Sequence, residues 1–458
     1  MSPQRGGVWT RLAVTLLVAI GARLAARIPL PGLDLSRIGQ TDSFDATMFG
    51  ILAFQLNPFL TAALLIEVLA LVIPRWRPWR VGGYPERERL WARVKVAALV
   101  LASVQAFFFV RWLVKADSDF ALFQMVVWSR NAPPVFIVQF VTLAAGPFLL
   151  FWLTRIIDRW GAGNGFAVIL AAFMAPSLAD AVASIRHRVD AGDRILLPLV
   201  VAAAVVAAVA HLAGGGSLRP GAVESHDNQL PAPSSSFYPV IASRALLDLP
   251  ARFVALGIGV GPLVIAPATW TYRAVLAAVI AGLCVLLAWL FNRPRIVAEA
   301  WQRTAKPSAV QAVHERVRGA FARSLAQSLG ICWGLVAVDW VWADAQLRIA
   351  AVNLAIIVCV ASDVASELRF RRRRGALAAV WPVHRLYLLQ GMLNALQAAG
   401  IPAFPRGRRF RTLWNFLTPY APVDILVQAE HAERARAILA PPAPVDAGPE
   451  PAPTSGAG

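Results

Sequence analysis

The sequence predicts an all-α polytopic membrane protein of about ten transmembrane helices, followed by a small cytoplasmic α+β domain. Hydrophobic residues make up 58% of the 458 residues and the mean hydropathy is +0.58, which leaves too little polar surface for one soluble domain. Apolar stretches long enough to cross a bilayer recur as far as Arg374, and short strand-like and helix-like patterns follow that residue.

The composition also limits the chemistry that the chain can perform. The six histidines are scattered, and Cys284, Cys332 and Cys359 all fall inside apolar runs without disulfide or metal-ligand spacing. The sequence contains no nucleophile–base pair and no phosphate-binding motif in a suitable context. We therefore expect a protein that is not an enzyme and that needs neither cofactor nor metal.

The predicted spans are bounded by prolines and polar residues. Pro29 and Pro31 end the first span, Asn57 and Pro58 interrupt the second, and Glu67 lies in its later half, where an intramembrane carboxylate is costly and usually faces the bundle interior or water. The expected spans are Trp9–Ala26, Gly50–Pro74, Val94–Val114, Phe136–Leu153, a fifth from Phe166, Leu196–Leu212, a seventh from Phe237, Tyr272–Phe291, Leu325–Trp342 and Leu347–Ala365.

Clusters of Lys and Arg predict the orientation. The net charge of +18 comes from 44 Lys and Arg against 26 Asp and Glu, and positive residues in short loops stay on the cytoplasmic side. Basic clusters at 75–95, 303–323 and 369–374 place these loops and both termini in the cytoplasm, where they would face anionic lipid and, as a second partner, ribosomal RNA. The loop carrying Arg186, Arg188 and Arg194 is expected outside, against this rule.

A turn at Gly161–Gly165 joins the fourth and fifth spans. Its glycines and Asn164 can adopt the positive φ of a sharp reversal, and Asn164 can cap the next helix. A phosphate-binding loop is the alternative interpretation, but such loops follow a strand, whereas a helix-length apolar segment precedes this one.

The residues around this turn resemble the junction of the fourth and fifth helices in the SecY family of protein-conducting channel subunits. Trp152, Leu153 and Ile157 precede the Gly-x-Gly-Asn-Gly sequence, and Ile28–Gly32 is similar to the Ile-Pro-x-Pro-Gly end of the family's first helix. The resemblance runs from about Arg11 to Arg374. The chain departs from the family at Arg155, which replaces a Glu, and in two cytoplasmic loops that lack the family's basic docking segments.

The resemblance implies a domain organisation. Residues 1–185 and 186–375 would form two five-helix halves related by inverted pseudo-symmetry, residues 376–440 the cytoplasmic domain, and residues 441–458 a disordered Pro- and Ala-rich tail.

The resemblance also implies functional positions, each with a simpler structural alternative. A Leu in a membrane helix ordinarily faces lipid or packs, residues 34–49 could form a plain outer loop, and small polar residues often mediate helix contacts. The expected positions are a pore ring of Leu56, Leu60, Leu170, Met174, Ile241 and Ala361; a plug including Phe44, Met48 and Phe49; a lateral gate including Gln105, Ser235, Ser236 and Ser243; and cytoplasmic docking residues Arg87, Arg89, Arg93, Arg316 and Arg318.

By this resemblance the chain would pass unfolded polypeptides across the bacterial inner membrane and into it. The implied partners are SecE- and SecG-like small membrane subunits, a motor ATPase (SecA) or the ribosome, the translocating polypeptide and anionic lipid. Two alternatives stay open: a solute transporter, if Glu67 and Arg155 form an intramembrane pair, and a non-conducting paralogue that serves as a membrane scaffold.

The C-terminal domain has its own pattern. We expect strands at Leu377–Val383, Ile401–Phe404 and Val423–Val427, with helices at His384–Ala399 and Ala432–Leu439. This order resembles a small bacterial signal-transducing domain. Four basic residues in its middle could meet lipid, RNA or a partner, or form a solvated loop: Arg406, Arg408, Arg409 and Arg411.

Overall fold

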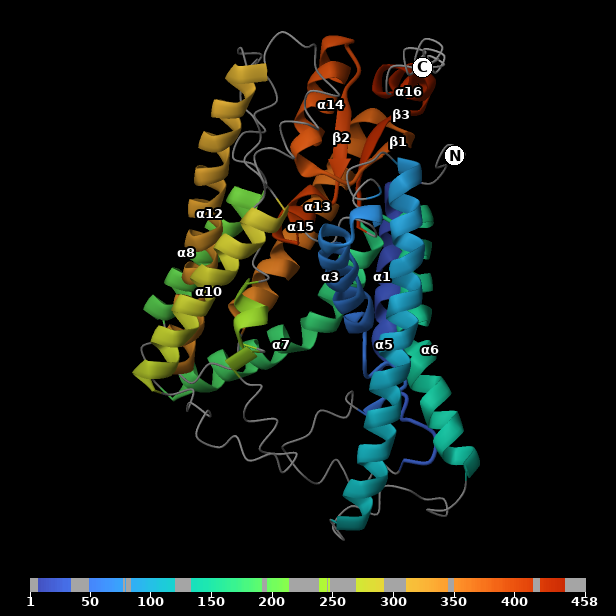
Figure 1. Ribbon diagram of the computed structural model, residues 1–458, viewed down its shortest axis with the longest axis vertical. Helices are drawn as coiled ribbons and strands as arrows, with labels where there is room; N and C mark the ends of the chain where they lie inside the picture. The colour runs from blue at the N-terminus through green and yellow to red at the C-terminus, as the bar shows by residue number, and fades with distance from the viewer. Residues whose placement is uncertain are drawn as a thin grey trace, which may run out of the picture.

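The computed structural model describes residues 7–33, 49–76, 79, 84–119, 133–191, 196–213, 239–244, 246–247, 269–291, 310–344, 350–414 and 421–440. Within these ranges the chain is a bundle of long helices with a small sheet domain at one end (Figure 1).

The helices form two groups: in Figure 1, α1, α3, α5 and α6 lie on the right, α8, α10 and α12 lie on the left, and α7 and α13 run between them. The groups meet where α7 packs on α13, and α1 also touches α13. The first group comprises α1 (Val8–Ala25), α3 (Asn57–Val72), α5 (Tyr84–Asp119), α6 (Pro133–Trp160) and α7 (Gly165–Asp190), and the second comprises α8 (Leu196–Ala213), α10 (Trp270–Phe291), α12 (Val310–Asp344) and α13 (Ala351–Arg374). Because α7 runs on to Asp190, it passes through the boundary predicted after residue 185.

The chain is a multi-pass membrane protein. Within the described residues, six helices are long and apolar enough to cross a bilayer, namely α1, α5, α6, α7, α10 and α13, and three shorter apolar helices occur at Asn57–Ala70, Leu199–Ala210 and Ser328–Trp342. The seventh predicted span is described only at 239–244 and 246–247, so the count of ten stays a prediction.

Several predicted boundaries in the helix bundle were wrong. The segment with Arg186 and Arg188, expected as a loop, forms the end of α7. Asn57 and Pro58 do not interrupt the second helix but begin it, because a proline at the start of a helix lacks only an N–H that has no partner there. The basic segments expected as loops before the third and ninth spans are helical: α5 starts at Tyr84 and α12 at Val310. Arg, Lys and Glu are good helix formers, and hydropathy detects only the part of a helix that lipid surrounds.

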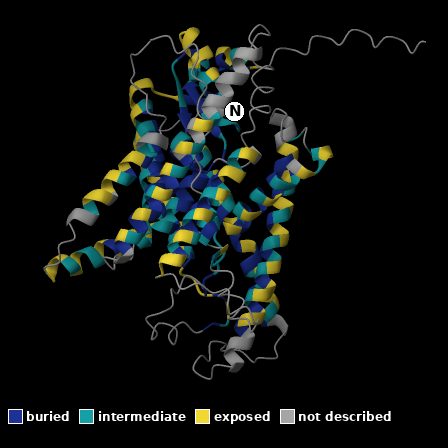
Figure 2. Cartoon of the chain, turned by 60° about the vertical axis from the view of Figure 1, so that its left-hand side comes forward, coloured by how far each residue is buried: buried dark blue, intermediate teal, exposed yellow. Residues whose placement is uncertain are grey.

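Apolar side chains fill the bundle and also cover its outside. Figure 2 shows buried residues between the helices and exposed ones along the outer faces. Large apolar side chains are exposed on several helices, for example Leu17 on α1, Phe108 on α5 and Trp152 on α6. Such a surface is unstable in water and stable in lipid.

The C-terminal domain forms a three-stranded antiparallel sheet of order β1-β3-β2. Its own apolar core lies between the sheet and the helices α14 and α16. The strand expected at Leu377–Val383 has these bounds, whereas the second strand begins two residues later than expected. The elements are β1 (Leu377–Val383), α14 (Leu386–Ala398), β2 (Ala403–Arg406), α15 (Arg408–Leu413), β3 (Val423–Gln428) and α16 (Ala432–Leu439).

The packing of α10 on α12 can be tested through two buried cysteines. The sulfurs of Cys284 and Cys332 lie 3.8 Å apart. A disulfide needs about 2 Å between them, so we expect membrane-permeant copper phenanthroline to join them within one chain. Proteolysis between the helices and mass spectrometry would detect the bond.

The buried Cys359 provides the control for this experiment. The Cys359→Ala variant should still form the bond, whereas Cys332→Ala should not. A bond that joins Cys359 to either other cysteine would contradict this packing.

Candidate functional site

The turn between α6 and α7 is the point at which the two helix groups and the C-terminal domain meet. Gly163 has a φ of +85°, and a Cβ on Gly165 would lie 2.0 Å from the Thr154 carbonyl oxygen, so neither position accommodates a side chain. The Asn164 side chain accepts the Ala167 N–H at 3.1 Å, which confirms the predicted helix cap. The Asp158 carboxylate accepts the Gly165 N–H at 2.7 Å.

Helix α1 holds the first half of this turn. The Arg11 guanidinium donates to the Gly161 carbonyl at 2.9 Å, and the Thr15 hydroxyl accepts the Ala162 N–H at 2.8 Å. Both side chains are buried, at 2% and 4% exposure. The polar backbone of the turn is thus satisfied inside the protein, as a non-helical segment surrounded by apolar side chains requires.

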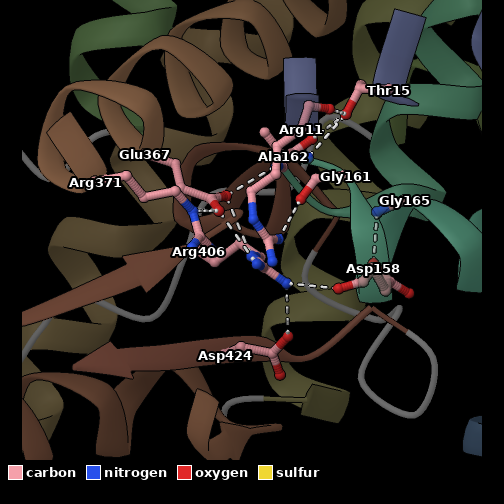
Figure 3. Close-up of polar contacts among 11 residues, drawn as sticks. Arg11, Thr15, Asp158, Gly161, Ala162, Gly165, Glu367, Arg371, Arg406 and Asp424 are labelled. Carbon is pink, nitrogen blue, oxygen red and sulfur yellow. Dashed lines mark hydrogen bonds and ion pairs between the residues drawn. The ribbon is translucent and has the colours of Figure 1, made fainter. Parts of the chain in front are cut away.

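Glu367, near the end of α13, holds the second half. Its carboxylate accepts the Gly163 N–H at 2.8 Å, Arg371 Nε at 2.8 Å, and Arg406 Nε and Nη2 at 3.1 Å each (Figure 3). Glu367 is 0% exposed and the two arginine side chains are 2–3% exposed. A buried charge is stable only when paired and hydrogen-bonded, and this carboxylate meets both conditions.

Arg406 carries the contact to the C-terminal domain. It lies at the end of β2, donates to the Asp158 backbone carbonyl at 3.1 Å, and lies 3.8 Å from the Asp424 carboxylate on β3 (Figure 3). Burial opposes the charge on Arg406, but attraction from Glu367, Asp424 and Asp158 outweighs it and raises the pKa of the guanidinium. Burial raises the pKa of Asp424 to about 6, against the opposing effect of Arg406.

Asp363, one turn before Glu367 on α13, anchors the start of α15. Its carboxylate accepts the backbone N–H groups of Arg409 at 3.3 Å and Phe410 at 3.1 Å, and the Arg409 guanidinium at 3.2 Å. A carboxylate at a helix N-terminus satisfies unpaired N–H groups and interacts favourably with the helix dipole. Gly407 precedes α15 with a φ of +74°, and a Cβ there would lie 3.0 Å from the Cβ of Asn164.

Five of the six predicted ring residues belong to one apolar cluster in the bundle. Leu56 and Leu170 are buried in it, and Leu60, Met174 and Ile241 pack against it, whereas Ala361 is exposed on α13 and lies outside it. These residues come from the start of α3, from α7 and from the segment 239–244. Their role as a pore constriction stays a prediction.

The predicted plug and gate are described only in part. Phe49 is buried in a second apolar cluster of the first helix group and lies 6.3 Å from Phe109 between ring centroids. Gln105 is half-buried on α5, and Ser243 is buried in the segment 239–244. The other plug and gate positions, Phe44, Met48, Ser235 and Ser236, lie outside the described residues.

The predicted docking residues lie on helices rather than in loops. Arg89 is exposed on the first turns of α5. The Arg93 guanidinium lies over Trp79, 3.9 Å from its ring centroid, and so packs against the protein. The side chains of Arg87 on α5 and of Arg316 and Arg318 on α12 lie outside the described residues.

Sequence reasoning missed the buried polar contacts of this site. Arg406 and Arg411 are both buried, so the expectation that they form a solvated loop or meet lipid, RNA or a partner was wrong for both. Arg11, Thr15 and Asp158 received no role at all. The one signal that could have indicated the contact is a charge pattern: two carboxylates at the end of an apolar helix, followed by a short arginine-rich segment.

Comparisons with known proteins connect the fold to a family. The family model described as SecY matches residues 50–307, more than half of the chain. Among curated proteins, the SecY translocase subunit of Thermus thermophilus is 30% identical over 177 residues, covering 35% of this chain and 40% of that protein. The SecY subunit of Streptomyces scabiei is 27% identical over 220 residues, covering 43% and 49%. The chain thus spans less than half the length of these relatives.

Two solved structures share the fold. One, described by the role of the SecY plug domain in stabilising the closed translocation channel, superposes with a TM-score of 0.54 at 14% identity, over 81% of this chain and 94% of that one. The other, described as a protein-conducting channel, superposes with a TM-score of 0.53 at 13% identity, over 81% and 95%.

The close approach at the turn gives a testable prediction. Gly165→Ala would place a methyl group against the Thr154 carbonyl, so we expect the free energy of unfolding to fall by about 1–3 kcal/mol, as overpacking typically costs. Detergent-solubilised protein should show this as a lower melting temperature.

Gly282→Ala on α10 is the matched control, because a Cβ there meets nothing within 4 Å. It should be neutral or slightly stabilising, as Ala is favoured over Gly inside helices. Equal melting temperatures for the two variants would contradict the packing described for the turn.

Proposed function

Because the chain belongs to the SecY family, we propose that it is a protein-conducting channel subunit through which unfolded polypeptides cross the membrane or enter it. The likeness to solved channels, over 81% of this chain, supports the fold that this function needs. We also infer that the chain catalyses no reaction, and that energy comes from a motor ATPase, the ribosome or the proton-motive force.

The observation that carries this proposal is the apolar cluster between the helix groups. Leu56, Leu170 and Ile241 share it, although they come from distant parts of the sequence. An apolar constriction dewets and so resists ions, yet flexible side chains can give way around a polypeptide. Parting of the two groups would let a segment of about 20 apolar residues enter the lipid.

The distribution of exposed arginines supports the proposed orientation in the bacterial inner membrane. Arg369 and Arg372–Arg374 are exposed at the end of α13, beside the C-terminal domain. The contact between Arg11 and Gly161 places the start of α1 at this same end. By the positive-inside rule this end is cytoplasmic, and its arginines suit anionic lipid. We propose small SecE- and SecG-like membrane subunits as further partners.

The transporter alternative required an intramembrane pair between Glu67 and Arg155. Glu67 is buried on α3, but Arg155 is exposed, with its guanidinium 5.1 Å from the ring centroid of Phe151. An exposed guanidinium does not form part of a buried substrate site.

A non-conducting scaffold stays the second candidate, because the C-terminal domain is held tightly on the bundle.

Polar substitution in the cluster tests the channel. We expect Leu60→Ser and Met174→Ser to raise ion leak through reconstituted vesicles by about tenfold or more, because a wetted constriction no longer repels ions. The measurement is the decay of a potassium gradient, followed with a voltage-sensitive dye.

Leu65→Ser is the matched control, since Leu65 is 43% exposed on the same helix as Leu60. It should leave the leak unchanged. Wild-type leak in both cluster variants would count against the constriction, and failure to rescue a SecY-depleted strain would favour the scaffold.

A further inference from the structure

The C-terminal domain touches both helix groups at the proposed cytoplasmic end. Its helix α15 packs on α8 and α13 of the second group. The ring of Phe410 on α15 also lies 6.4 Å from that of Phe166 on α7, in the first group. In Figure 1 the domain lies over the region where the two groups meet.

The side chains of α15 belong to the core of the bundle rather than to that of the domain. Phe410, Leu413 and Trp414 are 0–3% exposed and share the large apolar cluster with Leu170, whereas the domain's own core contains none of them. The domain thus inserts an apolar wedge between helices, and withdrawal of the wedge would expose its apolar surface to water.

The Glu367 carboxylate contacts both helix groups and the C-terminal domain. It accepts hydrogen bonds from Gly163 of the first helix group, from Arg371 of the second group, and from Arg406 of the domain. Removal of Arg406 from this site would leave the buried carboxylate with one fewer charge partner, and removal of the Gly163 turn would take away a further donor. Each contact therefore favours the others.

From these contacts we propose that residues 403–414 are an internal clamp, seated on the α6–α7 turn and the end of α13, that holds the two helix groups together at the cytoplasmic end. The occupant of this interaction surface is the chain's own β2–α15 segment. The groups part there only after the segment leaves.

Close contacts between the domain and the helix bundle favour a clamp over a loosely tethered domain. Gly407 packs closely against Asn164, where a Cβ would lie 3.0 Å from the Cβ of Asn164, and the Asn164 amide donates to the Pro422 carbonyl at 3.5 Å. Asp363 caps α15 from the second helix group. A tethered module would need none of these matched contacts. If the chain conducts polypeptides as proposed above, the seated clamp favours the closed channel, and this consequence rests on that proposed function.

The test measures the separation of the two groups without relying on conduction. Nitroxide labels at Val104→Cys on α5 and Val285→Cys on α10, both exposed, report the distance between the groups by pulsed electron resonance, with the three native cysteines replaced by Ala. The test variants are Glu367→Gln, which removes the shared charge, and Phe410→Ala, which shortens the wedge and keeps every charge. Glu433→Gln, at an exposed carboxylate on α16, is the matched control.

We expect both test variants to broaden the distance distribution and shift it to longer distances, and to speed amide exchange in 408–413 and 161–165 by about tenfold or more. The control should match the wild type. Phe410→Ala keeps the test valid if Glu367→Gln fails to fold. Faster exchange with an unchanged distance distribution would overturn the clamp, as would unchanged exchange.

Measurements of ion leak in the same variants then distinguish failure of the clamp proposal from failure of the proposed channel function. Increased leak in both test variants supports the clamp and the channel together. Unchanged leak in the test variants beside increased leak in Leu60→Ser would overturn the clamp as a restraint on conduction and leave the channel intact. Increased distances with no leak in any variant, Leu60→Ser included, would support the clamp and contradict the channel.

Discussion

One buried carboxylate, that of Glu367, sets the conditions that the surrounding structure has to meet. A carboxylate without solvent needs positive partners and N–H donors, and here two arginines and one backbone N–H supply them. To supply them, the α6–α7 turn must present the Gly163 N–H inward and β2 must end against the bundle at Arg406. The sheet domain is therefore packed against the helix bundle through buried contacts rather than tethered loosely to its end.

The polar junction and the apolar cluster are connected through α7. Gly165 starts this helix, and the Asn164 cap, the Asp158 contact and the close approach to Thr154 fix its direction. That direction determines where Leu170 and Met174, which follow within the next three turns of α7, face the cluster. In a channel of this family, the turn would thus set the geometry of the proposed constriction from the end of the bundle at which the proposed clamp lies.

The spacing of apolar residues, together with glycines, prolines and capping residues, predicted much of this fold. These signals act between residues that are close in the sequence. The helices, the turn at Gly161–Gly165, the Asn164 cap and the first strand of the small domain follow from apolar runs, glycines and a capping residue. The starts of α5 at Tyr84 and of α12 at Val310 could not be predicted from apolar runs. Charged residues form helix readily, so both helices extend beyond their apolar parts. The burial of Arg406 did not follow from any local pattern, because it depends on a partner 39 residues away on another element, and only the long-range charge pattern described above points to it.

The most direct test of this account is the coupling energy between Glu367 and Arg406, from unfolding of Glu367→Gln, Arg406→Gln and the double variant in mixed micelles. Residues that share a buried charge pair should couple by about 1–3 kcal/mol, so that the double variant loses clearly less stability than the two single losses added together. Additive losses would show that the two side chains act independently and would contradict the junction on which this account depends.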